Sequence, residues 1–386
     1  MMVRRSTPIV LVLLALAHCT RAADAPPLEP EPAPVDRAAL RERVADAAPP
    51  EPEPAPVDRA ALRERVAPLF GSLSPDRTSE DPEVEAARVE LGRKLYFETR
   101  LSKNHDLSCN SCHALDAYGV DVRERDGRRI PTSLGHKDAF GDRNSPSTYN
   151  AFAHVAQFWD GRAEDVEAQA KGPVLNPVEM ALPDAEFAVR VLRSIPGYRP
   201  LFEAAFPGEE EPVTYDNFGR AIGAFERKLV TPAPVDAFLA GQLDALNEVQ
   251  LRGFELFAER CVACHVGPGF GGAIYQKIGL MKPYETEDPG RFAVTGNEDD
   301  RKTFKVPSLR NVAKTQPYLH DGSVATLDEA IALMGEYQTV QGALEPQEIA
   351  DLRAFLDSLT GTLPEDLVAP PELPPSGPRT PRPDPS

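Results

Sequence analysis

Two pentapeptides contain the residues whose types and spacing could do chemistry. They are Cys109-Asn110-Ser111-Cys112-His113 and Cys261-Val262-Ala263-Cys264-His265. Two cysteines separated by two residues and followed directly by histidine form the attachment pattern of c-type haem. One helical turn places both sulfurs along one edge of the porphyrin, and the histidine can then bind the iron. Two copies of the pattern predict two covalently attached haems.

Four cysteines have other possible uses. A CxxC pair can form a redox disulfide or half of a zinc site, and in an exported protein four cysteines can form two disulfides. None of them explains why a histidine directly follows each pair. Of the 5 cysteines, only Cys19 lies outside the two motifs, and it lies close to the N-terminus. The haem interpretation therefore leaves no thiol of the later chain unused.

Amphipathic helices are expected to position the two motifs. Val84, Leu91 and Leu95 recur at helical spacing before the first motif. Two further apolar stripes follow the same period, one before the second motif and one that ends at Gly361: Leu246, Leu251, Phe254 and Phe257, then Ile349, Leu352, Phe355, Leu356 and Leu359. Strand signals are weak. The predicted fold class is mostly α, with two cytochrome c-like haem domains.

Composition divides the chain into segments with different expected roles. We expect a signal peptide at residues 1–23 and a Pro/Glu-rich duplicated linker at 24–80. An N-terminal haem domain follows at 81–230, a C-terminal haem domain at 231–364 and a Pro-rich tail at 365–386.

The linker contains two copies of EPEPAPVDRAALRERVA, at residues 29–45 and 51–67. We interpret it as a flexible spacer in which the second half of each copy can form a short helix. The Pro-rich turn at residues 231–234 is the predicted domain boundary. The tail is expected to be disordered, at least at its end.

The N-terminus resembles a secretory leader. Arg4 and Arg5 precede an apolar run that is too short to span a bilayer. We expect export to the periplasm, with a lipid anchor at Cys19 as the alternative that His18 argues against.

The net charge of −18 argues against a nucleic-acid partner, which would favour a basic face. It permits attraction of a basic electron carrier.

From about Leu91 to Gly361 the chain resembles the bacterial dihaem cytochrome c peroxidases. Besides the two haem motifs, the matching stretches are PTSLGH, RNSPSTYNAFAHVAQFWDGRA, GPVLNPVEM, GRFAVT and PYLHDG. The resemblance implies a periplasmic enzyme that reduces hydrogen peroxide to water. It implies electrons from a small cytochrome c or a copper protein (a cupredoxin), and a homodimer.

At the first haem the resemblance implies a site that opens. His113 and His136 would bind the iron, and His136 must leave before peroxide can bind, because an iron with two protein ligands has no open position. Glu179 would be the acid/base that moves a proton from one peroxide oxygen to the other. Gln169 and Phe158 match accompanying positions in the same pocket.

At the second haem the resemblance implies a site that stays closed. His265 would bind one face, and the opposite ligand is one of Met281, Met334 and His320, of which Met334 matches the family position. A thioether ligand raises the potential of the iron, which suits the storage of one electron. Trp159, the 1 tryptophan of the chain, would lie between the haems, either assisting electron transfer or only packing there.

The resemblance also implies a calcium ion between the domains. Asn144, Thr315 and Pro317 match its ligands, and oxygen donors of this kind suit calcium. His154 is expected in the core or at the surface and not at an iron. The charged stretch at 123–129 is an addition that the family usually lacks.

Two other functions are considered. A dihaem oxidase that modifies side chains of another protein is related, but such relatives hold the second iron with a tyrosine, so Met334 and His136 argue against it. A non-catalytic dihaem electron carrier would leave the NPVEM and QFWDGRA stretches without a purpose.

Overall fold

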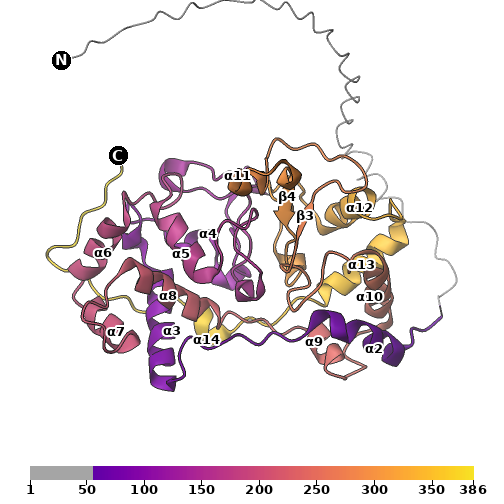
Figure 1. Cartoon of the computed structure of the whole chain (residues 1–386), viewed down its shortest axis with the longest axis horizontal. Helices are drawn as coiled ribbons and strands as arrows, with labels where there is room; N and C mark the ends of the chain where they lie inside the picture. The colour runs from indigo at the N-terminus through magenta and orange to yellow at the C-terminus, as the bar shows by residue number, and fades with distance from the viewer. Residues whose placement is uncertain (1–54) are drawn as a thin grey trace, which may run out of the picture. The chain divides into compact units, whose positions relative to one another are not determined.

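The computed structural model describes residues 55–386. The predicted signal peptide and the first copy of the repeat lie outside the described residues. Helices dominate the described part of the chain, and its strands form only two two-stranded sheets (Figure 1). The predicted mostly α fold class is confirmed.

The chain builds two lobes, each containing one haem motif. The first lobe (residues 82–230) contains α3 Pro82–Tyr96, α4 Cys109–Cys112, α5 Val166–Leu175, α6 Ala185–Ser194, α7 Tyr198–Ala205 and α8 Tyr215–Glu226. The second lobe (residues 231–360) contains α9 Pro234–Leu239, α10 Glu248–Arg260, α11 Phe292–Thr295, α12 Leu327–Gln338 and α13 Pro346–Asp357. The strands are β1 Glu124–Arg125, β2 Arg128–Arg129, β3 Tyr275–Lys277 and β4 Thr303–Lys305, and both pairs are antiparallel.

Each lobe is built on one closely packed pair of helices, α3 with α8 and α10 with α13. A Cβ atom added at Gly92 would lie 1.9 Å from the carbonyl oxygen of Ala221, and one added at Gly253 would lie 1.9 Å from that of Asp351. No side chain fits at either position, so glycine permits the backbones to touch. The same contact in both lobes shows that they share one architecture.

The hydrophobic core is divided in the same way. One cluster joins apolar residues from Leu91 to Leu229, and the other joins residues from Ala233 to Leu359. In the second cluster the rings of Phe254 and Phe355 stack with centroids 4.3 Å apart. The change from one core to the other falls inside the Pro-rich segment between α8 and α9.

The second copy of the repeat forms a helix, α2 Arg59–Phe70, which lies beside α9 and α10 (Figure 1). Leu62, Val66 and Phe70 are buried in the core of the second lobe. The Arg59 guanidinium donates to the carbonyl oxygen of Leu243 at 2.9 Å. The prediction of a flexible linker over residues 24–80 is therefore wrong for α2, because its apolar face finds a partner.

The Pro-rich tail lies against the first lobe. After α14 Glu365–Val368, its backbone carbonyls accept hydrogen bonds from the first lobe. Arg93 donates to Ala369 at 2.7 Å and Lys94 donates to Glu372 at 2.7 Å. The prediction of a disordered tail is wrong for these residues, because cationic side chains of α3 satisfy an extended backbone that cannot satisfy itself.

Buried polar side chains join the lobes where the core changes. Asn150 and Asn311 both donate to the hydroxyl oxygen of Thr231, at 2.8 Å and 2.9 Å. Both asparagines adopt φ of 61°, and each precedes a 3-10 turn in its own lobe. The junction is thus fixed by hydrogen bonds as well as by chain connection.

We expect Gly253→Ala to lower the free energy of unfolding of the second lobe by about 3 kcal/mol, because the added methyl group forces α10 away from α13. Gly172→Ala is the matched control, since a Cβ there would lie at an ordinary 3.5 Å from Phe158. It should be neutral or slightly stabilising. Chemical denaturation followed by circular dichroism measures both. Equal stability of Gly253→Ala and the wild type would contradict the requirement for close helix contact.

Candidate haem and active site

The first motif is placed by a short helix turn inside the first lobe. Tyr96 of α3 donates its hydroxyl hydrogen to the carbonyl oxygen of His113 at 2.8 Å. The Nδ1 atom of His113 lies 3.2 Å from the carbonyl oxygen of Gly119. Burial lowers the pKa of His113. A neutral imidazole that donates from Nδ1 keeps Nε2 free as an iron ligand.

The second motif follows α10 directly, and its histidine is held in the same manner. The Nδ1 atom of His265 lies 3.2 Å from the carbonyl oxygen of Phe270. Burial lowers the pKa of His265 to about 4, so its imidazole is neutral at physiological pH. Neither Cys261 nor Cys264 forms a disulfide. The two thiols and the neutral imidazole fit a covalently attached haem.

A cavity of about 270 Å³ lies over the second motif. Cys261, Cys264 and His265 line it, and so does Met334 from α12. Most of the remaining lining is apolar, including Phe257 and Ile331. A haem needs an apolar enclosure with a small number of placed polar groups. This cavity meets that requirement.

The three candidates for the second ligand of this iron have different surroundings. Met334 lines the cavity. Met281 is 47% exposed. His320 also lines the cavity, but its Nε2 lies 3.1 Å from the hydroxyl of Thr286 and its ring stacks on Phe304. These contacts favour Met334, because the other two side chains are either outside the cavity or already paired.

His136 lies against the turn that carries Glu179. Its backbone N–H donates to the carbonyl oxygen of Glu179 at 2.8 Å, and a Cβ at Gly135 would lie 1.9 Å from the carbonyl oxygen of Val178. The His136 Nε2 atom is buried and has no hydrogen-bond partner within the described residues. A buried imidazole nitrogen without a partner fits a metal ligand, because an iron would satisfy it.

The Glu179 side chain is half-buried near the first motif. Its Oε1 accepts a hydrogen bond from the Asn176 amide at 2.9 Å. Burial raises the pKa of Glu179 above its usual value, so this carboxyl holds a proton more readily than an exposed glutamate does. Burial also raises the pKa of the Cys109 thiol to about 12, and the charge of Glu179 adds to that rise. Glu179 therefore lies within electrostatic range of the first haem attachment.

Phe158 and Gln169 lie on segments that meet. The Phe158 ring approaches Gly172 of α5, and Gln169 is half-buried one turn earlier on the same helix. Sequence reasoning missed Arg162, whose guanidinium lies 3.5 Å from the centre of the Phe158 ring. Its charge also lowers the pKa of Glu179, against the effect of burial. The signal that could have identified Arg162 in the sequence was its place in the QFWDGRA stretch.

Trp159 extends from the first lobe into the second. It packs against the core of the second lobe and lines the large cavity. Its indole N–H donates to the carbonyl oxygen of Asn144 at 2.9 Å, and its ring meets His320 edge-on with centroids 6.4 Å apart. Its position between the two haems stays a prediction, and these contacts fit both electron transfer and packing alone.

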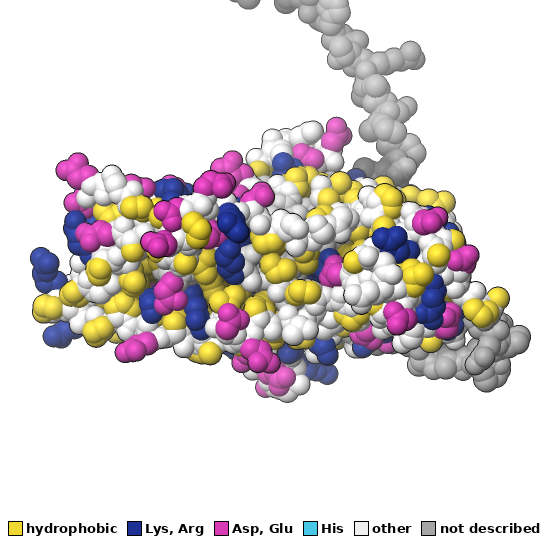
Figure 2. All heavy atoms as spheres, turned by 90° about the horizontal axis from the view of Figure 1, so that it is seen from below, with side chains coloured by type: hydrophobic (Ala, Val, Ile, Leu, Met, Phe, Trp, Pro, Cys, Tyr) yellow, Lys and Arg dark blue, Asp and Glu magenta, His cyan; other side chains and the backbone are white. Residues whose placement is uncertain are grey.

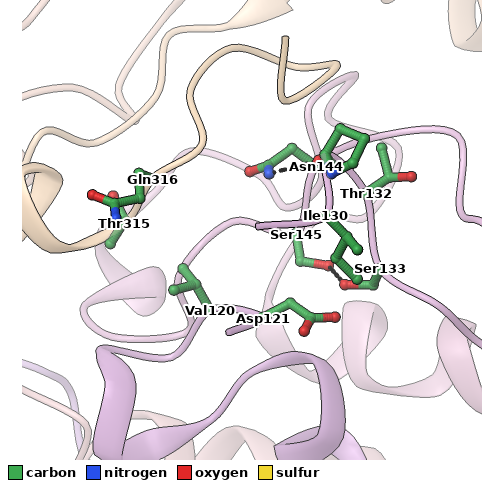
Figure 3. Close-up of a pocket in the computed structure, with 10 residues that line it drawn as sticks. Val120, Asp121, Ile130, Thr132, Ser133, Asn144, Ser145, Thr315 and Gln316 are labelled. Atoms are coloured by element: carbon green, nitrogen blue, oxygen red, sulfur yellow. Dashed lines mark hydrogen bonds between the residues drawn. The ribbon is translucent and has the colours of Figure 1, made fainter. Parts of the chain in front are cut away.

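Two of the three predicted calcium ligands line a small pocket of about 10 Å³, with room for one water-sized particle. Figure 3 shows Asn144 and Ser145 on one side and Thr315 with Gln316 on another. Pro317 lines the adjoining large cavity. No group of three or more His, Cys, Asp or Glu side chains within residues 55–386 could hold a metal ion. A calcium ion here would depend on amide, hydroxyl and carbonyl oxygens.

The additional charged stretch forms the β1–β2 hairpin. Arg123 beside it donates to Cys112 Sγ at 3.4 Å and pairs with Asp121, which lines the small pocket. The Arg125 guanidinium lies 5.0 Å from the centre of the Phe140 ring, on the loop that follows His136. The hairpin therefore contacts both the first motif and the loop of its second candidate ligand.

The surface mixes charges of both signs. Acidic and basic side chains are interspersed over the face shown in Figure 2, with hydrophobic side chains between them. Among residues 55–386 no helix combines the length and the apolar character needed to cross a membrane.

Comparison with known proteins gives consistent matches. The sequence model of the family described as di-haem cytochrome c peroxidase matches residues 86–244, and that of cytochrome c matches residues 250–360. The cytochrome c551 peroxidase of Nitrosomonas europaea is 47% identical over 301 residues, which cover 77% of this chain and 86% of that protein. The cytochrome c551 peroxidase of Pseudomonas aeruginosa is 43% identical over 307 residues, which cover 78% and 86%. A solved MauG-like protein associated with microbial copper homeostasis is 32% identical, covers 77% of this chain and 95% of that one, and superposes with a TM-score of 0.64.

Proposed function

The chain belongs to the dihaem cytochrome c peroxidase family, and we propose on that premise that peroxide is reduced at its first haem site while electrons enter at its second. It is a peroxidase that takes hydrogen peroxide as substrate and carries two c-type haems. One observation above all supports different roles for the two sites. The buried Nε2 of His136 has no hydrogen-bond partner among residues 55–386, and His136 contacts the turn of Glu179.

The first site is held by Cys109, Cys112 and His113 and regulated by His136. When bound, the haems supply the redox chemistry, with peroxide reduction at the first and storage of one electron at the second. His136 blocks access to the first iron, and its loop must move before peroxide can enter. That movement breaks the hydrogen bond from the His136 backbone to Glu179, so the block and the proton-transfer residue are physically linked.

Glu179 accepts a proton from one oxygen of peroxide and returns it to the other, so that water can leave. Its raised pKa suits both halves of that transfer. Asn176 orients the carboxyl by its hydrogen bond at 2.9 Å. Phe158 and Gln169 shape the same pocket, and Arg162 stacked on Phe158 adds positive charge beside it.

The second site is held by Cys261, Cys264, His265 and Met334. His265 and Met334 would both bind this iron and so keep peroxide from it, and the thioether would favour its reduced state. Trp159 contributes an aromatic ring between the two sites. Electrons come from a small cytochrome c, as the names of the relatives indicate for those proteins, or from a cupredoxin.

Asn144, Thr315 and Pro317 hold a calcium ion that couples the two sites. Trp159 donates to the carbonyl of Asn144, and Asn144 donates its backbone N–H to the carbonyl of His320 at 2.8 Å. An ion at Asn144 would therefore fix contacts to both lobes. The protein works in the periplasm, as its leader indicates, and forms a homodimer.

An oxidase that modifies protein side chains is the second candidate, and the similarity to a MauG-like structure is the observation in its favour. Met334 in the cavity of the second motif argues against it. A non-catalytic carrier is disfavoured by the family and by the polar turn at Glu179.

Glu179→Gln should lower the turnover number for peroxide by about a hundredfold or more, because the amide cannot accept and return the proton. Steady-state turnover with a reduced donor measures the loss. Glu186→Gln, at an exposed position on α6, is the control and should leave turnover unchanged. Normal turnover of Glu179→Gln would show that the proton moves by another route.

The fully oxidised wild type should be inactive, and addition of one electron should produce activity together with a high-spin signal from the other haem. EPR and peroxide turnover, measured on both states, test this order. His136→Ala should be active without prior reduction, because nothing then blocks the first iron. If the oxidised wild type is already high-spin and active, the blocking role of His136 is wrong. If neither state turns over peroxide, the carrier function replaces the peroxidase.

Removal of calcium by a chelator should lower peroxide turnover by about tenfold or more, and added calcium should restore it, because the ion fixes contacts of Asn144 to both lobes. Asn144→Ala should show low turnover that neither treatment changes. Metal analysis before and after chelation confirms the removal. Full activity of the calcium-free wild type would rule out the coupling role.

A further inference from the structure

The cavity over the second motif contains a positive charge without a protein counter-charge. Its cationic lining residues are Arg260, Arg310 and Lys305, and among the described residues that line it none is an aspartate or glutamate. Arg260 pairs with Glu348 at 2.7 Å and Arg310 pairs with Asp236 at 2.7 Å. Within residues 55–386, Lys305 alone of the three has no carboxylate at ion-pair distance.

Lys305 is held firmly in this position. It ends β4, its side chain belongs to a residue only 5% exposed, and its backbone N–H donates to the carbonyl oxygen of Trp159 at 2.8 Å. Burial lowers the pKa of Lys305 to about 8, which leaves the ammonium group mostly protonated at neutral pH. A buried charge without an opposite charge is costly, so its presence requires an explanation.

His154 is the only polar side chain bonded to Lys305 in the described part of the chain, and it is neutral. Its Nδ1 lies 3.2 Å from Lys305 Nζ. Burial, together with the charge of Lys305, lowers the pKa of His154 well below its usual value. Nδ1 accepts from the ammonium group, so the imidazole hydrogen is on Nε2. That Nε2 is buried and has no partner within the described residues.

The pair therefore presents unused donors, the remaining ammonium hydrogens and the imidazole Nε2–H, beside a cavity that has no protein carboxylate. A haem attached at Cys261 and Cys264 would supply two anionic propionates, whereas the described residues that line the cavity supply no carboxylate. We propose that Lys305, supported by His154, binds a propionate of the second haem. The inference rests on the part of the proposed function that places a haem at the second motif.

This contact has a consequence for electron transfer. A positive charge beside the haem stabilises the reduced state and so raises the reduction potential of the second iron. The backbone of Lys305 is bonded to that of Trp159, so the same strand end sets the charge at the second haem and anchors the aromatic residue between the sites.

The test is a spectroelectrochemical titration of the full holoprotein, in which the two haems are followed separately. Lys305→Gln should lower the potential of the second haem, so that its ratio of oxidised to reduced form at a fixed potential rises by about tenfold, which is 59 mV for one electron. Lys305→Arg keeps the charge and should titrate like the wild type. Lys277→Gln removes a lysine from the exposed end of the partner strand and is the matched control.

Haem content and resonance Raman spectra of the propionate bending bands accompany each titration. His154→Gln, a milder change, should move a propionate band of the second haem even if Lys305→Gln fails to incorporate haem. Unchanged potentials in Lys305→Gln with full haem content would overturn the proposal. A shift confined to the first haem would overturn the assignment to the second. If Lys305→Gln lowers the potential of the second haem as expected but the protein does not turn over peroxide, this proposal is supported and only the proposed function is contradicted.

Discussion

The contact of two helix backbones in each lobe is the constraint on which both haem sites depend. Gly92 against Ala221, and Gly253 against Asp351, allow no side chain between the helices. In the second lobe α10 ends at Arg260, so this contact fixes where the first cysteine of the motif begins. A haem attached by two thioether bonds tolerates little displacement of the helix that carries them. The contact at Gly253 thus positions the start of the second motif.

The two sites differ because different segments cover their open faces. In the first lobe the loop of His136 contacts the polar turn of Glu179, and one backbone hydrogen bond joins them. In the second lobe α12 places Met334 in a cavity with mostly apolar walls. Under the proposed function, the first arrangement would allow an iron to open and a proton to move. The second would favour a closed iron that exchanges electrons only.

The lobes are joined by more than the chain segment between them. Thr231 accepts hydrogen bonds from one asparagine of each lobe. Arg143 of the first lobe pairs with Asp160 at 2.6 Å and with Asp288 of the second lobe at 2.7 Å. Buried charge-assisted contacts of this kind resist relative motion of the lobes. The fixed junction keeps Trp159 in place between the two sites.

The sequence by itself determined the haem chemistry, because covalent attachment needs a local pattern in which a histidine directly follows each cysteine pair. The two motifs, the apolar stripes of α3, α10 and α13, and the residues of the Glu179 turn are all readable without coordinates. What the sequence could not decide was how distant segments combine. The two copies of the repeat are identical, but the second is followed by Phe70 where the first has Ala48.

Only the tertiary structure shows that Phe70 stacks on Phe270 with centroids 4.1 Å apart, which makes a core helix of a segment that reads as a spacer. The tail is held in place for a similar reason, because its backbone carbonyls accept hydrogen bonds from Arg93 and Lys94, which lie far away in the sequence. Lys305 and His154 are separated by 151 positions, and neither carries a local signal. A buried ammonium group, a neutral imidazole and a cavity define a site only when folding brings them together, because burial decides what a charged group requires.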